Sequence, residues 1–422
     1  MNQLVFDSRK IEKNDVFVAQ KGVSVDGHLY IEKAISLGAT VIICEDFPSD
    51  KKQGVTYIQV EDANVALAIM ASNFYENPSS KFAVVGVTGT NGKTTIASLL
   101  YQLFHKAGYK VGLLSTVKIL VDETEFKATH TTPDSVTINM YLDYHATFAE
   151  YRDVKKSFFD SLPKSAFALT NIDDKNGDFM LQNTKAKKKT YALKTLADYK
   201  SKILEKQISG TLISVDGTEV WTKLIGVFNI YNLTAIIATA ELLGLEKLEI
   251  LTIVSQLESV SGRFQYVMSD DGITAIIDYA HTPDALKNVL ETINDIRTGN
   301  EKVITVVGCG GDRDKTKRPK MAHIASQLSS QAIFTSDNPR TENAQTILDE
   351  MEVGVAAENY RKTLTVLDRR QAIKTACKLS ETGDIILIAG KGHENYQEIN
   401  GIRSHFDDLE EVANCFNQLK KN

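Results

Sequence analysis

Cysteine is scarce in this sequence of 422 residues. The four cysteines, Cys44, Cys309, Cys377 and Cys415, lie far apart, and no two of them have the C-x-x-C spacing. This pattern favours free thiols in a reducing cytoplasm over a disulfide framework or a zinc site.

Long apolar runs and an excess of basic side chains are also missing. No run is long and apolar enough to span a bilayer, and the N-terminus continues directly into polar sequence, without a signal peptide. Lys and Arg total 48 against 54 Asp and Glu, which gives a formal net charge of −6. Because phosphate neutralisation requires a basic surface, we expect no nucleic-acid partner. We also expect no membrane insertion and a cytoplasmic location.

The apolar content is high enough for folded domains. Hydrophobic residues make up 43% of the chain, which excludes intrinsic disorder. A single core rarely grows beyond about 250–300 residues, so two or three domains are expected. We predict domains over residues 1–78, 79–260 and 261–422, with a turn-rich linker at the first boundary.

Strand-like and helix-like segments alternate from residue 82 onward, which predicts βαβ units and parallel sheets. The fold class is therefore α/β. In the last third, strands are predicted at 273–277, 303–307, 332–335 and 385–389, with helices at 283–296, 319–328, 344–353 and 369–379.

The most specific motif is a glycine-rich loop that ends in Lys93-Thr94-Thr95. It follows an apolar run at 82–87, which we predict to be a buried strand, and it precedes a helix-like stretch at 96–107. Backbone N–H groups of such a loop point at phosphate, and the helix N-terminus adds positive potential. Lys93 would neutralise the β- and γ-phosphates of a nucleotide, and Thr94 would bind Mg²⁺. The glycine spacing is shorter than in the usual phosphate loop.

A second site is predicted where the four late strands end. Polar loops at 278–284, 308–314, 336–340 and 390–394 follow these strands, and ligands bind beyond the carboxyl ends of parallel strands. Each loop alone could be an ordinary turn, but four at one edge indicate a site. Arg313 and Arg340 could each bind a carboxylate, and Glu394 could accept from an ammonium group. An amino acid carries both charges and would fit this set.

Three further features are ambiguous on composition alone. Asn229 and Asn232 share one face of a helix, where they could bind a ligand or serve as a cap and a surface residue. Arg263 could contact phosphate or belong to a simple turn. We interpret Lys155, by composition alone, as a surface lysine.

The motifs together resemble those of the Mur ligase family. The resemblance runs over nearly the whole chain, from Asp7-Ser8-Arg9 and residues 22–28 to the loop at 390–394, and it includes G-T-N-G-K-T-T, H-T-T-P-D, S-G-R-F and D-N-P-R. It implies three domains: a UDP-sugar domain, a central ATP domain of the phosphate-loop type with a parallel sheet, and a C-terminal Rossmann-like domain.

The resemblance also implies an activity. The chain would be an ATP-dependent amide ligase that adds meso-2,6-diaminopimelate to UDP-N-acetylmuramoyl-L-alanyl-D-glutamate through an acyl phosphate. The form Asp337-Asn338-Pro339-Arg340 is associated with diaminopimelate, because Arg340 can pair with the distal carboxylate that lysine lacks. ATP and Mg²⁺ would be the cofactors, and the protein would act as a monomer.

Site residues follow from the matching motifs. Lys93, Lys155 and Asp278 would be catalytic, and Thr94 and a carbamylated Lys155 would position the metal. The nucleotide would be held by Gly89, Thr90, Asn91, Gly92, Lys93, Thr94, Thr95, Asn229 and Arg263. The UDP-MurNAc-dipeptide would contact Ser8, Thr131 and Thr132, and diaminopimelate would contact Arg313, Asp337, Asn338, Pro339, Arg340, Gly390 and Glu394.

The chain departs from the family pattern near residues 139–143. A few dozen residues that carry two central strands and a metal-binding glutamate have no counterpart between Thr132 and His145. Their loss would remove apolar burial from the central sheet. The alternatives are therefore a catalytically impaired or inactive relative that binds the nucleotide or the UDP-sugar, and a ligase similar to folylpolyglutamate synthase.

Overall fold

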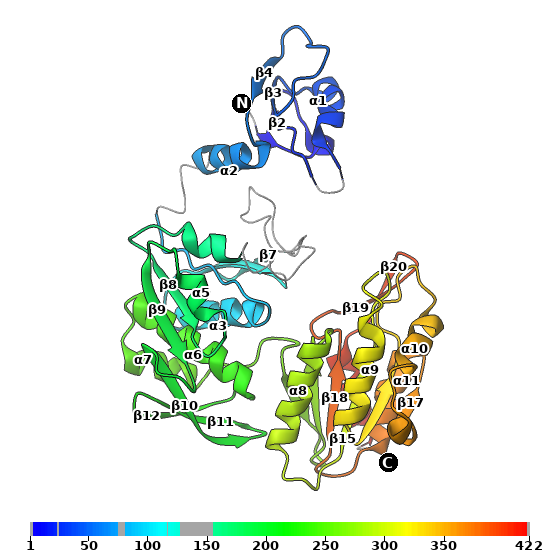
Figure 1. Cartoon of the computed structure of the whole chain (residues 1–422). Helices are drawn as coiled ribbons and strands as arrows, with labels where there is room; N and C mark the ends of the chain where they lie inside the picture. Colours follow the sequence, from blue (N-terminus) through cyan, green and yellow to red (C-terminus); the bar gives the residue numbers. More distant parts are fainter. Residues whose placement is uncertain (1–2, 23–24, 75–80, 116, 127–154, 420–422) are drawn as a thin grey trace. The chain divides into compact units, whose positions relative to one another are not determined.

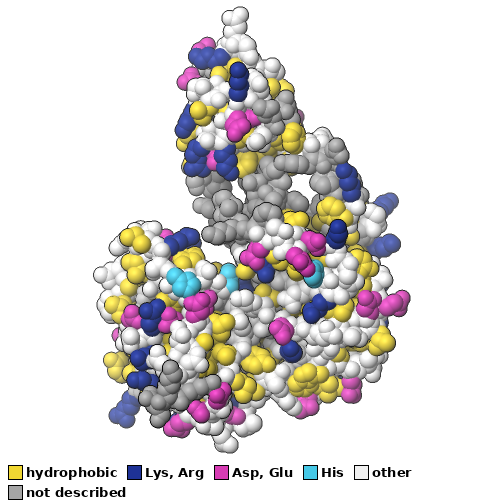
Figure 2. Space-filling model, turned by 180° about the vertical axis from the view of Figure 1, so that it is seen from behind, with side chains coloured by type: hydrophobic (Ala, Val, Ile, Leu, Met, Phe, Trp, Pro, Cys, Tyr) yellow, Lys and Arg dark blue, Asp and Glu magenta, His cyan; other side chains and the backbone are white. Residues whose placement is uncertain are grey.

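The computed structural model describes residues 3–22, 25–74, 81–115, 117–126 and 155–419 (Figure 1). The chain divides into two compact units, the first of which contains residues 1–87 and the second residues 88–113 and 156–422. No helix among these described residues could cross a membrane. On the face drawn in Figure 2, Lys and Arg side chains are interspersed with Asp and Glu.

The N-terminal part of the chain forms a four-stranded parallel sheet. Its strands lie in the order β1 (Leu4–Val5), β2 (Val16–Val18), β3 (Val41–Cys44) and β4 (Thr56–Gln59). Alternate residues of a strand face opposite sides, so the sheet has two apolar faces. Phe17 and Ile42 pack with α1 (Ile31–Leu37), and Val18 and Ile43 pack with α2 (Ala63–Phe74). The short helices η1 (Ser8–Lys10) and η2 (Gly27–Tyr30) complete this layer arrangement.

The predicted buried strand at 82–87 is not formed. Within the described residues this segment belongs to no sheet, and Phe82 and Val84 are 64% and 58% exposed. A strand gains stability only from paired backbone groups and from burial against a neighbour. The run is apolar enough for a buried strand, but among the described residues no strand pairs with it.

The central part contains two sheets and a helical layer. The five-stranded sheet has the order β12 (Thr218–Thr222), β11 (Gly210–Val215), β10 (Tyr199–Gln207), β9 (Lys187–Ala192) and β8 (Phe167–Asn171). Only β8, β9 and β10 are parallel to one another. A smaller sheet contains β5 (Gly112–Leu114), β6 (Ile119–Val121) and β7 (Thr124–Phe126). The helices are α3 (Lys93–Lys106), α5 (Gly177–Leu181), α6 (Val227–Leu242) and α7 (Lys247–Val254).

The C-terminal part is a six-stranded sheet with helices on both faces (Figure 1). The strand order is β13 (Gln265–Met268), β14 (Thr274–Asp278), β18 (Ile385–Ala389), β15 (Val303–Val307), β16 (Gln331–Phe334) and β17 (Thr363–Thr365). All neighbouring strands of this sheet are parallel except β13, which is antiparallel to β14. The strand β13 was not among the predicted strands.

The helices of this part divide between the two faces of the sheet. One face packs against α8 (Pro283–Ile296), α9 (Lys317–Leu328) and α10 (Ala344–Glu352), and the other against α11 (Arg369–Leu379) and α12 (Asp408–Leu419). Beyond the sheet lie η5 (Ala357–Lys362) and a hairpin of β19 (Tyr396–Ile399) and β20 (Ile402–His405). The predicted helices and strands of this region agree with these bounds to within two residues.

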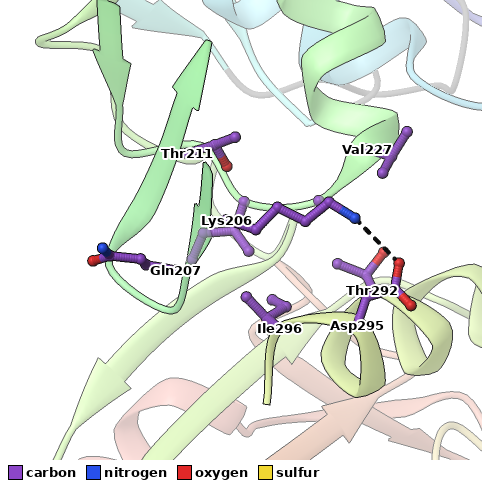
Figure 3. Close-up of a pocket in the computed structure, with 9 residues that line it drawn as sticks. Lys206, Gln207, Thr211, Val227, Thr292, Asp295 and Ile296 are labelled. Carbon is purple, nitrogen blue, oxygen red and sulfur yellow. Dashed lines mark hydrogen bonds and ion pairs between the residues drawn. The ribbon is translucent and has the colours of Figure 1, made fainter. Parts of the chain in front are cut away.

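A small pocket lies between the β10–β11 turn and α8 (Figure 3). Lys206 Nζ lies 3.3 Å from Asp295 Oδ2 across it, and Gly226 and Thr292 line its wall. Its volume is about 10 Å³, roughly that of one water molecule. None of the predicted site residues lines this pocket, so we assign it a packing role.

A buried ion pair joins α11 to α12. Arg369 donates to both carboxylate oxygens of Asp408 at 2.8 Å and to the carbonyl of Ala389 at 3.1 Å, and both charged side chains are fully buried. The adjacent Arg370 makes a similar pair with Glu411, but 57% of its side chain is exposed. The two arginines therefore offer a matched comparison of a buried pair and an exposed pair.

We predict that Arg369→Met lowers the free energy of unfolding by about 3–5 kcal/mol, because it leaves the buried Asp408 carboxylate without its counter-ion. Arg370→Met should cost less than about 1 kcal/mol, since an exposed pair is screened by water. Urea unfolding of the full chain, followed by circular dichroism, measures both values. Equal losses in the two variants would contradict this interpretation.

Candidate functional site

Four polar loops meet at one edge of the C-terminal sheet. They follow β14, β18, β15 and β16, which are consecutive neighbours in the strand order. The strands are parallel, so their carboxyl ends lie at the same edge. The structure therefore brings together the four loops that the sequence analysis assigned to an amino-acid site.

The loops after β16 and β18 are joined by a buried cluster of charges. Asn338 Nδ2 donates to Glu394 Oε2 at 2.8 Å, and Lys391 Nζ lies 3.1 Å from Asn338 Oδ1. The same ammonium lies 3.7 Å from Asp337 and 3.8 Å from Glu394. The side chain of Lys391 is fully buried, so it acts as a fixed counter-ion between the two carboxylates. Sequence analysis missed Lys391, because a lysine in a glycine-rich loop is usually exposed.

Burial opposes the charges of Lys391 and Glu394. It lowers the pKa of Lys391 and raises the pKa of Glu394, while the hydrogen bond from Asn338 works against the shift of the carboxyl group. The surroundings of Glu394 therefore disfavour its ionised form, and a bound cation would stabilise that form.

The two predicted arginines border the same glycine. A Cβ on Gly310 would lie 2.9 Å from Arg340 Nη1 and 3.9 Å from Arg313 Cγ. Arg340 donates from Nη1 to the carbonyl of Gly311 at 2.8 Å, and its backbone has a left-handed φ of 51°. Arg313 is exposed. Arg340 and Arg313 therefore lie on either side of Gly310 and bring positive charge to the loops that follow β15 and β16.

A buried network holds the arginine loops in place. Arg318 is fully buried, and its guanidinium contacts Glu342 at 2.8 Å and Glu350 at 2.6 Å. Glu342 also accepts from the backbone N–H of Asp312 at 2.6 Å, and the bond with Arg318 lowers the pKa of Glu342 to about 2. None of the three charged residues of this network was predicted from the sequence, although Glu342 lies two residues after the quoted D-N-P-R motif.

Backbone contacts restrict two further positions of the site. A Cβ on Gly390 would lie 2.7 Å from Asp337 Oδ2, and Gly390 has a φ of 114°. A Cβ on Gly311 would lie 1.9 Å from the carbonyl oxygen of Pro339. Only glycine fits these close approaches, so the loops can pack edge to edge without side chains between them.

Asp278 and Arg263 lie beside these loops. Asp278 ends β14 and accepts from the backbone N–H of Phe264 at 2.7 Å, and burial raises the pKa of its carboxyl to about 6. The guanidinium of Arg263 lies 4.6 Å over the ring of Tyr279. The hydrogen bond from the Phe264 backbone thus fixes the Asp278 carboxylate, and the Tyr279 ring orients Arg263.

The glycine-rich loop has the form of a phosphate cradle. Gly92 has a φ of 82° and precedes α3, and Lys93 Nζ donates to the carbonyls of Gly89 and Thr90 at 2.7 and 3.3 Å. No acidic residue occupies the first turn of α3, so the helix N-terminus keeps its positive potential. Thr94 and Thr95 follow in the first turn, and Asn91 is exposed at the loop.

The asparagines of α6 lie against this cradle. Asn232 Oδ1 is 2.6 Å from the position that a Cβ on Gly92 would occupy, and Asn232 Nδ2 lies 3.4 Å from Asn229 Oδ1. Asn229 is buried and donates to the carbonyl of Ile225 at 2.8 Å. Asn232 therefore lies against the phosphate loop, and Asn229 lies behind it, so the role of Asn229 in nucleotide binding stays a prediction.

Of the remaining predicted site residues, the structure describes Lys155 and Ser8 but not Thr131 and Thr132. Lys155 lies in a helical stretch over residues 155–160 and is 6% exposed, so its interpretation as a surface lysine is wrong. Ser8 is the first residue of η1 and is buried. Thr131 and Thr132 lie outside the described residues. In the described part of the chain, no group of three or more His, Cys, Asp or Glu side chains could hold a metal ion.

Three family models match the chain in order. Residues 2–75 match the Mur ligase family catalytic domain, residues 87–142 and 140–240 the Mur ligase middle domain, and residues 262–392 the Mur ligase glutamate ligase domain. A UDP-N-acetylmuramoyl-L-alanyl-D-glutamate–2,6-diaminopimelate ligase of Cytophaga hutchinsonii is 50% identical over 462 positions, which cover 99% of this chain and 95% of the relative. The chain belongs to the Mur ligase family.

Other comparisons agree with this membership. A ligase of the same name from Bacteroides thetaiotaomicron is 47% identical and covers 97% of this chain and 94% of the relative. A solved structure of such a ligase has a TM-score of 0.66 at 30% identity, with 99% and 95% coverage. A MurF ligase from Thermotoga maritima in complex with ADP, at 20% identity and TM-score 0.62, shows the fold alone. Mur ligases are ATP-dependent ligases of peptidoglycan precursor synthesis, which confirms the predicted enzyme class and fold.

The comparisons also locate the departure from the Mur ligase pattern. The middle-domain match is broken at residues 140–142. The alignment with the Cytophaga relative spans 462 positions against 422 residues here, so at least 40 positions have no residue in this chain. The break in the middle-domain match lies where the sequence analysis predicts the departure from the family pattern.

Proposed function

We propose that this chain joins meso-2,6-diaminopimelate to UDP-N-acetylmuramoyl-L-alanyl-D-glutamate with ATP. The observation that carries the proposal is the charge arrangement at the C-terminal sheet edge. Arg313 and Arg340 border Gly310, and Glu394 lies in the neighbouring loop with Lys391 and Asn338. A ligand with carboxylate and ammonium groups matches both ends of this arrangement. Relatives named for this substrate support the choice.

The chemistry requires two steps. A carboxylate oxygen of the UDP-linked dipeptide attacks the γ-phosphorus of ATP, which gives an acyl phosphate and releases ADP. The neutral amine of diaminopimelate then attacks the acyl carbon, so that the amide forms, inorganic phosphate leaves and the amine loses a proton. Carboxylate and ATP repel each other, and Lys93 with the N-terminus of α3 would reduce this repulsion.

Magnesium belongs to this proposal as a companion of ATP. The Thr94 hydroxyl in the first turn of α3 suits a Mg²⁺ ligand, and Lys155 would become a second ligand if carbamylated. The Thr94 hydroxyl offers an oxygen as it stands, whereas Lys155 would offer oxygens only as a carbamate, and the phosphate oxygens of ATP would supply further oxygen ligands. Bound Mg²⁺ would neutralise charge on the transferred phosphoryl group.

The other binding roles remain part of the proposal. Ser8, Thr131 and Thr132 would contact the UDP-MurNAc-dipeptide, and Asn229, Arg263 and Asp278 the nucleotide. The chain would work as a cytoplasmic monomer on small molecules, without nucleic acid and without insertion into a membrane. Domain boundaries near residues 78 and 260 would separate the three binding functions.

A specific observation favours impaired catalysis in this chain. The segment that leads into the phosphate loop is exposed and belongs to no sheet among the described residues, so the loop lacks the support of a preceding strand in that part of the chain. A loosely held loop would bind nucleotide but align the γ-phosphate poorly. A folylpolyglutamate synthase of Thermotoga maritima, at 14% identity, resembles the chain in fold alone, which gives that alternative little support.

We predict that inorganic phosphate release requires ATP, Mg²⁺, the UDP-MurNAc-dipeptide and diaminopimelate together, at a rate about 100-fold below that of the Cytophaga relative. Lys93→Ala should abolish the release. Phosphate release at the full rate would refute the impairment. Binding without any ADP formation would indicate a non-catalytic relative, and stimulation by folate would indicate the other ligase family.

A second prediction concerns the choice of amino acid. Arg340→Ala should abolish the use of diaminopimelate and weaken its binding about 100-fold, because the distal carboxylate loses its charged partner. The weak binding of lysine, which lacks that carboxylate, should not change. Isothermal titration of both amino acids measures this, with the exposed Arg361→Ala as the control. Unchanged diaminopimelate binding by Arg340→Ala would remove the basis for the specificity.

A further inference from the structure

Three loops of the C-terminal part cross at Tyr279. The backbone N–H of Tyr279 donates to the carbonyl of Gly262 at 2.9 Å. A Cβ on Gly262 would lie 2.1 Å from the backbone nitrogen of His393, and a Cβ on Gly392 would lie 2.7 Å from Tyr279 Cβ. The crossing has no room for other side chains, so the backbone and Cβ of Tyr279 have a fixed place between the loops, from which the ring extends.

The Tyr279 side chain contacts residues from two different parts of the proposed site. The guanidinium carbon of Arg263 lies 4.6 Å from the centre of its ring, and the centre of the His393 ring lies 4.9 Å from the same point. Its hydroxyl donates to Glu394 Oε1 at 3.3 Å. Arg263 is assigned to the nucleotide and Glu394 to the amino acid, and Tyr279 is the side chain that touches both.

The orientation of Arg263 depends on the Tyr279 ring. Arg263 is largely buried, and its Nε has no hydrogen-bond partner among the described residues. Stacking on an aromatic face is therefore the contact that fixes the plane of its guanidinium. A change in the ring position would turn the hydrogen-bond donors that Arg263 presents to a phosphate.

The orientation of Glu394 depends on the Tyr279 hydroxyl. Glu394 accepts from Asn338 through Oε2 and from Tyr279 through Oε1, so the two bonds fix both carboxylate oxygens. Burial raises the pKa of Tyr279 to about 12, which keeps its hydroxyl protonated and able to donate. Without that bond the carboxylate could rotate away from an incoming ammonium group.

We propose that Tyr279 is a positioning residue that couples nucleotide binding to amino-acid binding. The inference rests on the proposed function, because that function assigns the two ligands to Arg263 and Glu394. Nucleotide bound to Arg263 restrains the Tyr279 ring and thereby its hydroxyl. Glu394 is then already ordered when the amino acid arrives. By linkage, each ligand strengthens the binding of the other by the same factor.

Calorimetric titration of the full chain tests this coupling. A non-hydrolysable ATP analogue with Mg²⁺ and meso-diaminopimelate are titrated separately, and then each in the presence of the other. Wild-type protein should bind each ligand about 5-fold more tightly when the other is present. Tyr279→Phe removes only the hydroxyl, so it should weaken diaminopimelate about 10-fold and change the affinity for the analogue less than 2-fold.

A second variant and a control complete the design. Tyr279→Leu also removes the aromatic face, so it should weaken both ligands, the analogue about 5-fold. Tyr360→Phe, at an exposed tyrosine of η5, should change nothing. Independent binding of the two ligands in the wild type, or equal loss of both in Tyr279→Phe, would overturn the coupling alone. Failure of the wild type to bind either ligand would overturn the proposed function and this inference with it.

Discussion

The buried ammonium of Lys391 is the contact on which the C-terminal site depends. It lies among Asn338, Asp337 and Glu394. Glu394 belongs to the same loop as Lys391, whereas Asn338 and Asp337 belong to another loop, and Asn338 lies 53 residues before Lys391 in the sequence. Two carboxylates at such close range would repel each other and take up protons if the cation were missing. Its burial is costly, and that cost is offset only while all of these partners remain in place. The same charge therefore holds the loops together and sets the polarity of the pocket.

The parallel sheet explains why so many polar residues can meet at this edge. The strands β14, β18 and β15 are fully buried and β16 is buried except at Gln331, and the polar loops begin where each strand ends. Glycines at the crossings, such as Gly311 and Gly390, let the loops touch backbone to backbone. Long side chains such as Arg340 then extend across the edge. The arrangement gives a rigid base with charged groups on top, which suits the recognition of a small zwitterion.

The sequence predicted the C-terminal elements well because their signals are local. The helix at 283–296 has a threonine cap, a proline in its first turn and an amphipathic face, and the structure has the same bounds. The strand expected at 82–87 could not be judged from its own residues, since the stability of a strand depends on paired neighbours, and among the described residues none pairs with this segment. The same limit applies to Lys155, Arg318 and Lys391. A charged residue is predicted to be exposed as long as its buried partners are unknown.

The phosphate loop and the amino-acid site thus differ in how well they are supported. Asn232 packs against Gly92, but the segment before the loop belongs to no sheet in the part of the chain that the structure describes. The C-terminal site is held by buried ion pairs, close glycine contacts and the Arg318 network. Amino-acid recognition should therefore survive the shortening of the middle domain better than catalysis does.

A crystal structure of the chain with meso-diaminopimelate tests the account most directly. The account predicts ligand density at the edge of the C-terminal sheet, with a carboxylate at the Arg340 guanidinium and an ammonium group at Glu394. Density at another place, or a well-ordered C-terminal sheet edge that stays empty at saturating ligand, would contradict it.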